Sequence, residues 1–376
     1  GSTITTGDQS VGLFAQSVGG SGGNGGMPIS GVIAGTDAKT LSASVGGFGG
    51  AGTNSDKVTI DNTGAISTYG VESHAIQAQS IGGGGGNGGM AVSAVIGSLG
   101  TGTNFNAGVT VGGFGGDAGF AGDVFVTNHG LLQTGLLAAG QTITNGDGAY
   151  GIFAQSVGGG GGSGGNAITG VLGLNGNNAG TQVNVSVAVG GSAGNGNTGG
   201  NVTIRQYGGI ETNGMGAFGI LAQSIGGGGG TGGRANSISL QLGAKCTLPK
   251  VCEPAGGKPN WNLQATVGGA GGTGNDAQTV DVGNYDFITT HGDKSSGIVA
   301  QSIGGGGGIG GDAYVGTGGL LAIPYVPVDP TLLLKPLGTS SLTRSGTVAI
   351  GGNGAGGGNG GTVIVTNEGV ITTNGT

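Results

Sequence analysis

Two cysteines have the spacing that most directly suggests chemistry. Cys246 and Cys252 lie six positions apart in the segment CTLPKVC. A disulfide between them would close a short loop, and such bonds persist in oxidising compartments. Two free thiols are the alternative, and a zinc site is disfavoured because no further Cys or His lies close enough in sequence to complete four ligands. We therefore predict a disulfide between Cys246 and Cys252.

Three aspartates follow glycines in a pattern similar to the calcium-binding nonapeptide GGxGxDxUx, namely Asp117, Asp276 and Asp312. Only Asp312 is followed by a suitable apolar residue, Tyr314, and a calcium β-roll needs consecutive nonapeptides. The sequence therefore predicts no metal site, and no cofactor is expected.

The remaining candidates for catalysis are histidines and carboxylates. His74, His129 and His291 have no neighbouring cysteine or carboxylate cluster, and they are predicted to be solvated turn residues. The 17 acidic residues do not recur as the carboxylate pair that glycoside cleavage requires. The chain is predicted not to be an enzyme, with a carbohydrate-active β-helix lyase or hydrolase as the alternative.

Composition narrows the classes of protein further. Glycine supplies 103 of 376 residues, charged residues are 7%, and the net charge is −7. Eight prolines are too few for collagen, and sparse charge with abundant small apolar residues disfavours a charge-rich disordered chain. Ten Lys and Arg residues cannot form a basic face, so no nucleic-acid partner is expected. No run of about 18 apolar residues occurs, so no membrane-spanning helix is predicted.

The elements that would position these residues are organised by a repeat. One phrase, a Gln-Ser pair followed by an apolar residue and a glycine run, occurs five times. Successive copies are 63, 76, 68 and 78 residues apart. Their glutamines are Gln16, Gln79, Gln155, Gln223 and Gln301.

Other parts of the repeat keep a strict spacing. The end of one strand and the start of the next are separated by 13 residues in all five copies, as from Val45 to Val58. We therefore predict a single repetitive domain, 1–376, in which a stacked frame is fixed and one segment varies. The variable segments are expected to be hairpin-like excursions at 27–44, 90–110, 166–188, 234–266 and 312–349.

The frame is predicted to be β throughout. VTIDNTGAIST from Val58 and VIVTNEGVITT from Val363 alternate apolar and polar residues and then turn. Short strands repeated in register can bury their apolar faces only by stacking, which favours an all-β solenoid, most simply a parallel β-helix with glycine-rich strands. Stacked amides would then form structural ladders at the five glutamines and at Asn62, Asn128, Asn284 and Asn367, with Gln206 in the remaining copy.

The glycine runs have two interpretations. A flexible linker would tolerate changes of length, yet the run keeps its length in all five copies, with Ser21 and Asn24 interrupting the first. Ordered glycine costs roughly 0.5–1 kcal/mol relative to alanine. We therefore predict polyglycine-type strands packed backbone to backbone.

The fifth excursion contains the most apolar segment, LLAIPYVPVDPTLLLKPL from Leu320, with four prolines that disfavour a central strand. These apolar side chains either pack on the neighbouring arm or form a contact patch for a partner. The candidate contact residues are Leu320, Leu321, Ile323, Tyr325, Val326, Leu332, Leu333 and Leu334.

Several phrases also resemble a known family. TNEGVITTNG from Thr366, GAYGIFAQSVGGGGGSGG from Gly148 and SSGIVAQSIGGGGGIGG from Ser295 resemble the glycine-rich repeats of passenger domains of Gram-negative type V autotransporters. The resemblance covers nearly the whole chain outside the excursions. It implies a parallel β-helix, secretion, display on the bacterial surface, and roles in adhesion, aggregation or biofilm contact.

The resulting hypothesis is an extracellular structural or adhesive passenger segment. Its expected partners are host or abiotic surfaces, glycans or further copies of itself, contacted weakly and at many points. The start at Gly1-Ser2 and the end within a repeat are interpreted as those of an excerpt. The resemblance then implies that the full protein is anchored in the outer membrane through a C-terminal barrel outside this excerpt. An ice- or surface-binding array is a third possibility.

Overall fold

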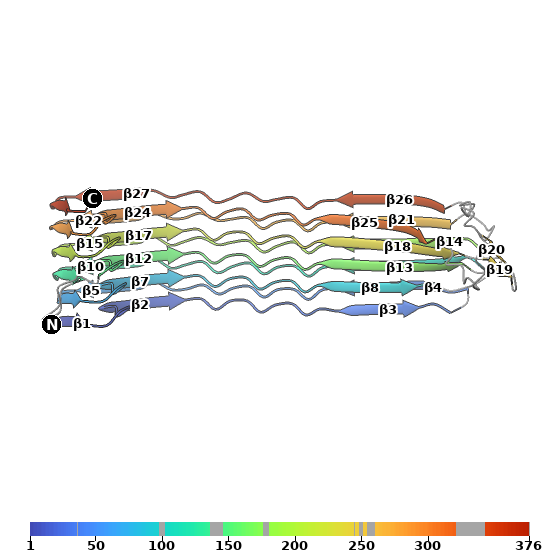
Figure 1. Ribbon diagram of the computed structural model, residues 1–376, viewed down its shortest axis with the longest axis horizontal. Coiled ribbons are helices and arrows are strands. Elements are labelled where there is room, and N and C mark those ends of the chain that lie inside the picture. The colour runs from blue at the N-terminus through green and yellow to red at the C-terminus, as the bar shows by residue number, and fades with distance from the viewer. Residues whose placement is uncertain are drawn as a thin grey trace, which may run out of the picture.

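The chain winds into five stacked coils that together form a long, flat slab (Figure 1). The computed structural model describes residues 1–35, 37–97, 102–135, 146–175, 180–243, 245–247, 251–253, 260–320 and 343–375. Every regular element in these ranges is a β-strand. Within the same ranges, no helix is long and apolar enough to span a bilayer. The predicted all-β repetitive solenoid is therefore confirmed.

Each coil gives one strand to each of five parallel sheets, numbered here 1 to 5 in chain order, and sheet 1 has a sixth strand. Sheets 1, 2 and 5 lie together at one end of the slab, which we call the closed end (Figure 1). Sheet 1 consists of β1 (Ser2–Thr5), β6 (Ala65–Thr68), β11 (Leu132–Thr134), β16 (Ile210–Thr212), β23 (Ile288–Thr290) and β28 (Ile371–Thr373). Sheet 2 consists of β2 (Leu13–Val18), β7 (Ile76–Ile81), β12 (Ile152–Val157), β17 (Ile220–Ile225) and β24 (Ile298–Ile303). Sheet 5 consists of β5 (Val58–Asn62), β10 (Val124–Asn128), β15 (Val202–Gln206), β22 (Val280–Asn284) and β27 (Val363–Asn367).

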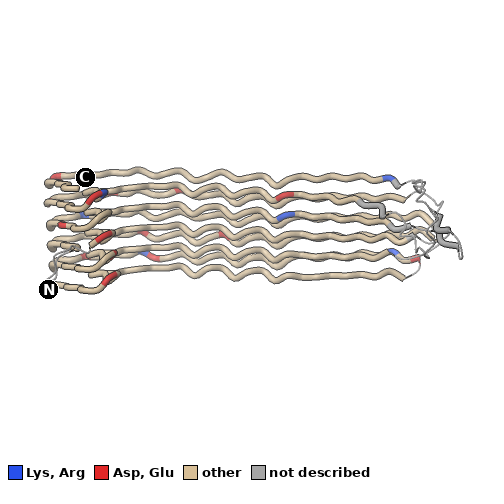
Figure 2. The backbone as a smooth tube through the Cα atoms, in the orientation of Figure 1, with Lys and Arg blue, Asp and Glu red and all other residues tan. Residues whose placement is uncertain are grey.

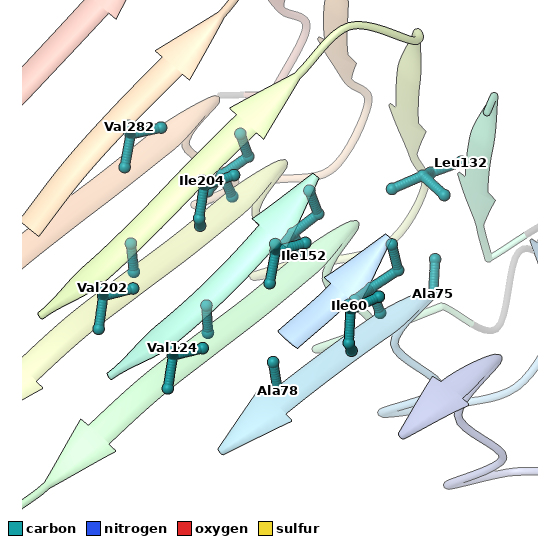
Figure 3. Close-up of a cluster of buried hydrophobic side chains, with 14 of the residues drawn as sticks. Ile60, Ala75, Ala78, Val124, Leu132, Ile152, Val202, Ile204 and Val282 are labelled. Atoms are coloured by element: carbon teal, nitrogen blue, oxygen red, sulfur yellow. The ribbon is translucent and has the colours of Figure 1, made fainter. Parts of the chain in front are cut away.

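The core of the closed end is a column of aliphatic side chains. Alternate residues of each strand point inward, so every coil places the same kinds of side chain in the same layer. Ile60, Ile152 and Ile204 lie among them (Figure 3), with Val124 and Val282 continuing the sheet 5 rows. Fully burying such a side chain contributes about 1.5–3 kcal/mol, so the column is the main apolar source of stability in the slab.

The turn between sheets 1 and 2 has the same backbone conformation in every coil. The residue four positions before each sheet 2 strand has a positive φ, at Gln9, Glu72, Gly148, Gly216 and Lys294. Glycine adopts this left-handed conformation at little cost, whereas the other three residues are held there by the stack. Gln9 Nε2, for example, donates a hydrogen bond of 3.0 Å to Glu72 Oε2 of the next coil.

The excursions form the opposite end of the slab, which we call the arms. Each runs out through sheet 3 and returns through sheet 4. Sheet 3 consists of β3 (Ile29–Ile33), β8 (Ala91–Ile96), β13 (Ala167–Asn175), β18 (Ala235–Gly243) and β25 (Ala313–Leu320). Sheet 4 consists of β4 (Lys39–Val45), β9 (Asn104–Val111), β14 (Gln182–Val189), β21 (Asn260–Val267) and β26 (Thr343–Ile350).

The two strands of an excursion face each other and pair with the equivalent strands of neighbouring coils. Ser30 opposes Ser93 in sheet 3, and Leu41 opposes Ala107 in sheet 4. The excursions thus extend the stack across the whole slab. One antiparallel ladder is described, at the tip of the fourth excursion, between β19 (Lys245–Thr247) and β20 (Val251–Glu253).

Candidate functional site

Between the closed end and the arms, the glycine runs form an ordered array (Figure 1). We call it the glycine array. Its outward runs are 19–27, 82–90, 158–166, 226–234 and 304–312, and its return runs are 46–57, 112–123, 190–201, 268–279 and 351–362. Hydrogen bonds recur at every third residue, as expected for polyglycine in the extended threefold helix, with about 3.1 Å of rise per residue.

The first residue of each triplet binds the same run in the next coil. Gly82 N–H donates to the Val157 carbonyl at 2.9 Å, and Gly85 N–H donates to the Gly160 carbonyl at 2.9 Å. This bond always points toward the C-terminal side of the stack. The array therefore has a direction, with donors on one side of each coil and acceptors on the other.

The second residue of each triplet binds the other column of runs. Gly86 N–H in an outward run donates to the Gly50 carbonyl at 2.8 Å in the return run of the preceding coil. Gly116 N–H in the next return run donates back to the Gly86 carbonyl at 2.8 Å. The two columns are joined in this way along the described stack, which confirms the prediction of glycine strands packed backbone to backbone.

The third residue of each triplet faces outward. A Cβ placed on Gly160 would meet its nearest atom, the Gly228 carbonyl oxygen, at 3.7 Å, and a Cβ on Gly306 would meet nothing within 4 Å. All the non-glycine residues of the outward runs occupy this position. They are Ser21, Asn24, Met27, Asn87, Met90, Ser163, Asn166, Thr231, Arg234, Ile309 and Asp312.

In the outward runs of coils 2 to 5, space restricts the first and second positions to glycine. A Cβ on Gly161 would lie less than 3.0 Å from the backbone of Gly194 in the facing return run, and a Cβ on Gly162 would lie less than 3.0 Å from the backbone of Gly86 in the outward run of the preceding coil. No glycine of the array has a positive φ, so its backbone conformation is one that other residues can adopt. The outward runs thus have side chains only at the outward-facing third position, whereas the return runs also have alanine at some first positions, at Ala118, Ala121, Ala193 and Ala277.

Asparagine and aspartate at the third position cap the next coil. Asp117 Oδ1 accepts a hydrogen bond of 2.7 Å from Asn195 N–H, and Asn195 Oδ1 accepts one of 2.9 Å from Thr273 N–H. Asp276 Oδ1 likewise accepts from Asn359 N–H at 2.6 Å. Two of the aspartates considered as calcium ligands therefore bind backbone amides.

The third such aspartate, Asp312, lies 3.2 Å from the Arg234 guanidinium and accepts a hydrogen bond from the Tyr314 hydroxyl at 3.3 Å. Across the described ranges, no group of three or more His, Cys, Asp or Glu side chains could hold a metal ion.

The five glutamines of the recurring phrase form a continuous ladder on sheet 2. Each Nε2 donates to the Oε1 of the next coil, at 3.2 Å from Gln16 to Gln79, 3.4 Å from Gln79 to Gln155, 3.0 Å from Gln155 to Gln223 and 2.7 Å from Gln223 to Gln301. Like the array, this ladder is directional, because every amide donates toward the C-terminal side.

The sheet 5 amides form a second, interrupted ladder. Asn62 donates to Asn128 at 2.6 Å, Asn128 donates to Gln206 at 3.0 Å, and Asn284 donates to Asn367 at 2.7 Å. Gln206 also donates to the carbonyl two residues further on, Gly208, as the four asparagines do in their own turns, but no bond from Gln206 to Asn284 is described.

A shallow groove of about 440 Å³ crosses coils 3 to 5 where the outward runs meet sheet 3. Its two walls are rows of third-position side chains, Ser163, Thr231 and Ile309 on one side and Asn166, Arg234 and Asp312 on the other. Glycines form its floor. The two charges of the groove are paired with each other, and charged residues are sparse along the whole slab (Figure 2).

The three histidines lie in rows of stacked side chains at the closed end. His74 stacks on Tyr150, with ring centroids 4.7 Å apart, and His129 stacks on Tyr207 at 4.8 Å. His291 Nε2 lies 3.3 Å from Glu211 Oε1. Burial lowers the pKa of His74 to about 4, against a smaller opposing effect of Glu72. His74 Nδ1 accepts the Tyr150 N–H at 3.0 Å, an arrangement that requires this nitrogen to be unprotonated.

The cysteines and the apolar segment are only partly described. Cys246 and Cys252 are directly opposite each other in the β19–β20 ladder. Their side chains lie outside the described part of the chain, so the disulfide stays a prediction. Leu320 ends β25, where its backbone pairs with Leu242. The other candidate contact residues, from Leu321 to Leu334, lie outside the described residues.

Sequence reasoning missed the division of the glycine run into three faces. The signal was present, because the interruptions Asn24, Asn87, Ser163, Thr231 and Ile309 occupy one equivalent position, three residues before a second variable position. A period of three in the non-glycine residues is the mark of a threefold helix.

The chain was also compared with known proteins. No family model, no curated protein and no solved structure matches it.

Proposed function

We propose that the chain is a non-enzymatic scaffold displayed outside a bacterial cell, where it adheres to surfaces, glycans or other copies of itself. The observation that carries this proposal is the repetition of outward-facing positions in register over five coils. A weak contact made by one coil can be made again by the next, so the total avidity rises far above that of a single contact.

Two further features support an adhesive scaffold. The outer face of the array presents short polar and apolar side chains on a backbone that is hydrogen bonded in two directions, so little conformational entropy is lost when that face binds. The charges of the groove neutralise each other, which suits uncharged partners better than nucleic acid.

The location rests on the resemblance of the AQS-glycine phrases to autotransporter passenger repeats and on the predicted Cys246–Cys252 bond. Anchoring in the outer membrane through a C-terminal barrel of a longer protein is part of the same proposal.

The test is to display the chain on a non-adherent Gram-negative host and to measure attachment to abiotic and glycan-coated surfaces and cell aggregation. Cells with the display anchor alone are the control. Attachment or aggregation above the control is expected, and it should fall when Gly161→Ala disrupts the array at equal surface abundance. Equal behaviour of cells with and without the chain would refute the proposal.

A further inference from the structure

The third-position amides of the glycine array point to its outer faces. Where the preceding coil has an asparagine or aspartate at the same place, that side chain accepts a hydrogen bond from the amide. Asn87 Oδ1 accepts from Ser163 N–H at 2.8 Å, and Asn166 Oδ1 accepts from Arg234 N–H at 2.8 Å. Third-position amides are therefore donors directed sideways from the stack, and further coils along its axis would not cover them.

One row of these amides has no partner in the part of the chain that the structure describes. Gly84, Gly160 and Gly228 occupy this row in coils 2 to 4, and none of their N–H groups donates a hydrogen bond to a described residue. Their carbonyls are already bonded, since Gly160 accepts from Gly85 N–H and Gly228 accepts from Gly161 N–H, both at 2.9 Å. We call this row of unpaired donors the amide row.

Neither space nor backbone conformation requires glycine in the amide row. A Cβ on Gly84, Gly160 or Gly228 would meet its nearest atom, a carbonyl oxygen of the next coil, at 3.6, 3.7 and 3.5 Å, which is ordinary contact. None of the three has a positive φ. Every other third-position row of the array has side chains throughout coils 2 to 4. Glycine also serves where a ligand approaches the backbone closely, and this explanation remains for the amide row.

The two flanks of the amide row are uncharged and unlike each other. On one side, Ser163 and Thr231 form a row of hydroxyls, in which Thr231 Oγ1 donates to Ser163 Oγ at 3.0 Å. These residues are also one wall of the groove described above. On the other side, Ile81, Val157 and Ile225 end their strands half-buried on the outer face of sheet 2. A ligand on the amide row meets donors beneath it, hydroxyls on one side and aliphatic groups on the other.

We propose that an extended, uncharged polysaccharide lies along the stack axis on the amide row and accepts hydrogen bonds from Gly84, Gly160 and Gly228. This inference rests on the proposed adhesive function and names glycans as its ligand. A sugar ring has oxygen acceptors at its edge and C–H groups on its faces, which match the donors, hydroxyls and aliphatic side chains of this surface. Successive amides are one coil apart, about 4.8 Å, so a chain of sugars can use several of them at once.

Other occupants fit the amide row less well. The amide row of a second copy presents donors as well, so two such rows cannot pair. A polyanion would find no cation in either flank, and the net charge of the chain is −7. An extended polypeptide has an N–H for nearly every carbonyl, and those N–H groups would meet no free acceptor in the row. An uncharged polymer rich in oxygen atoms satisfies the donors without these costs.

The test is isothermal titration calorimetry of the purified chain with cellohexaose, chitohexaose and mannohexaose, with polygalacturonate as the anionic comparison. Binding of at least one uncharged hexasaccharide is expected, together with changes in the amide NMR signals of Gly84, Gly160 and Gly228. Absence of binding for all three, or tighter binding of polygalacturonate, would overturn the proposal.

Two matched substitutions locate the site. Gly160→Asn places a side chain in the amide row, where it can accept from Gly228 N–H as Asn87 accepts from Ser163 N–H. Ser192→Asn makes the same change at a third position of the same coil on the return face. Both variants should fold, because asparagine already occupies third positions. Gly160→Asn should lower glycan affinity about tenfold, and Ser192→Asn should leave it unchanged. Equal effects would overturn the site.

A third variant separates glycan binding from a structural role. A methyl group fits at Gly160, so Gly160→Ala should be at least as stable as the parent chain. It should nevertheless weaken glycan binding several-fold, because the methyl group holds the sugar away from the backbone. Unchanged affinity in this stable variant would overturn the close approach.

The glycan site and the adhesive function can fail separately. If cells that display the chain attach to surfaces while the purified chain binds no hexasaccharide, the glycan site is refuted and the adhesive function stands. If the purified chain binds a hexasaccharide while those cells attach no better than control cells, the adhesive function is refuted and the glycan site stands.

Discussion

Alanine at neighbouring positions of one glycine run should have opposite effects on stability. Gly160, Gly161 and Gly162 lie in the central coil, and none has a positive φ. A Cβ at Gly160 meets nothing closer than 3.7 Å, whereas one at Gly161 would lie less than 3.0 Å from the backbone of Gly194. The three sites share sequence context, coil and backbone conformation, so space is the main difference between them.

The magnitudes follow from these contacts. Gly160→Ala should raise the free energy of unfolding by about 0.4–1 kcal/mol, because alanine reduces the conformational entropy of the unfolded chain. Gly161→Ala should lower it by about 1–3 kcal/mol through overpacking. Displacement of the run would also weaken the bonds from Gly161 N–H to the Gly228 carbonyl and from Gly194 N–H to the Gly162 carbonyl, each worth about 0.5–1.5 kcal/mol. The two variants should therefore differ by at least about 2 kcal/mol.

Urea unfolding followed by far-ultraviolet circular dichroism measures this difference. Because a repeat protein can unfold in parts, amide hydrogen exchange at position 161 and at Gly194, the two donors of these bonds, should accompany it. Faster exchange at these amides is expected in Gly161→Ala and not in Gly160→Ala. Equal destabilisation by both variants would refute the assignment of three distinct faces.

Three other predictions concern single side chains. His74 has a folded pKa of about 4, below the ordinary 6.5. The stability that the neutral imidazole contributes is therefore present above pH 6.5 and is lost as the pH falls toward 4, by up to about 3 kcal/mol. His74→Phe should flatten that part of a curve of unfolding free energy against pH. Gln155→Ala breaks two ladder bonds and should lower the free energy of unfolding by about 1–2 kcal/mol, whereas Gln77→Ala, without a described hydrogen bond, should change it little. Because Asp117 accepts a hydrogen bond from Asn195 N–H, a chelator should leave the thermal unfolding midpoint unchanged. A lower midpoint with chelator would instead indicate a calcium site.

The stack itself could be predicted from the sequence, because its evidence lies in spacing. The constant 13 residues from Val45 to Val58 and from Val111 to Val124 correspond to a return run that crosses the array. Fixed spacing of this kind indicates equivalent coils. The rows of Gln and Asn followed from the same register, since equivalent residues of stacked coils are neighbours.

The interior of the arms could not be predicted from hydrophobic alternation, because the polar residues of these strands face inward and the valines face outward. In β14 the valines Val183 and Val185 are half-buried on the outer face, while Asn184 and Ser186 are fully buried between the sheets. Neighbouring coils satisfy part of these polar groups: Asn106 Nδ2 donates to Asn184 Oδ1 at 3.0 Å, whereas Asn184 Nδ2 has no hydrogen-bond partner among the described residues. A single strand contains no sign of these partners, which come from another repeat.

The glycine array separates stability from surface chemistry. In an ordinary sheet, a side chain on one face alters packing against cross-strand neighbours. In the outward runs, the contacts between runs are made by backbone at the first and second positions, and Ser163, Thr231 and Ile309 stand equally well at the third. The outer face can therefore change residue by residue while the hydrogen bonds beneath it stay the same. An adhesive protein whose targets vary would benefit from this separation, and the outward rows of the array are where differences in binding should be sought.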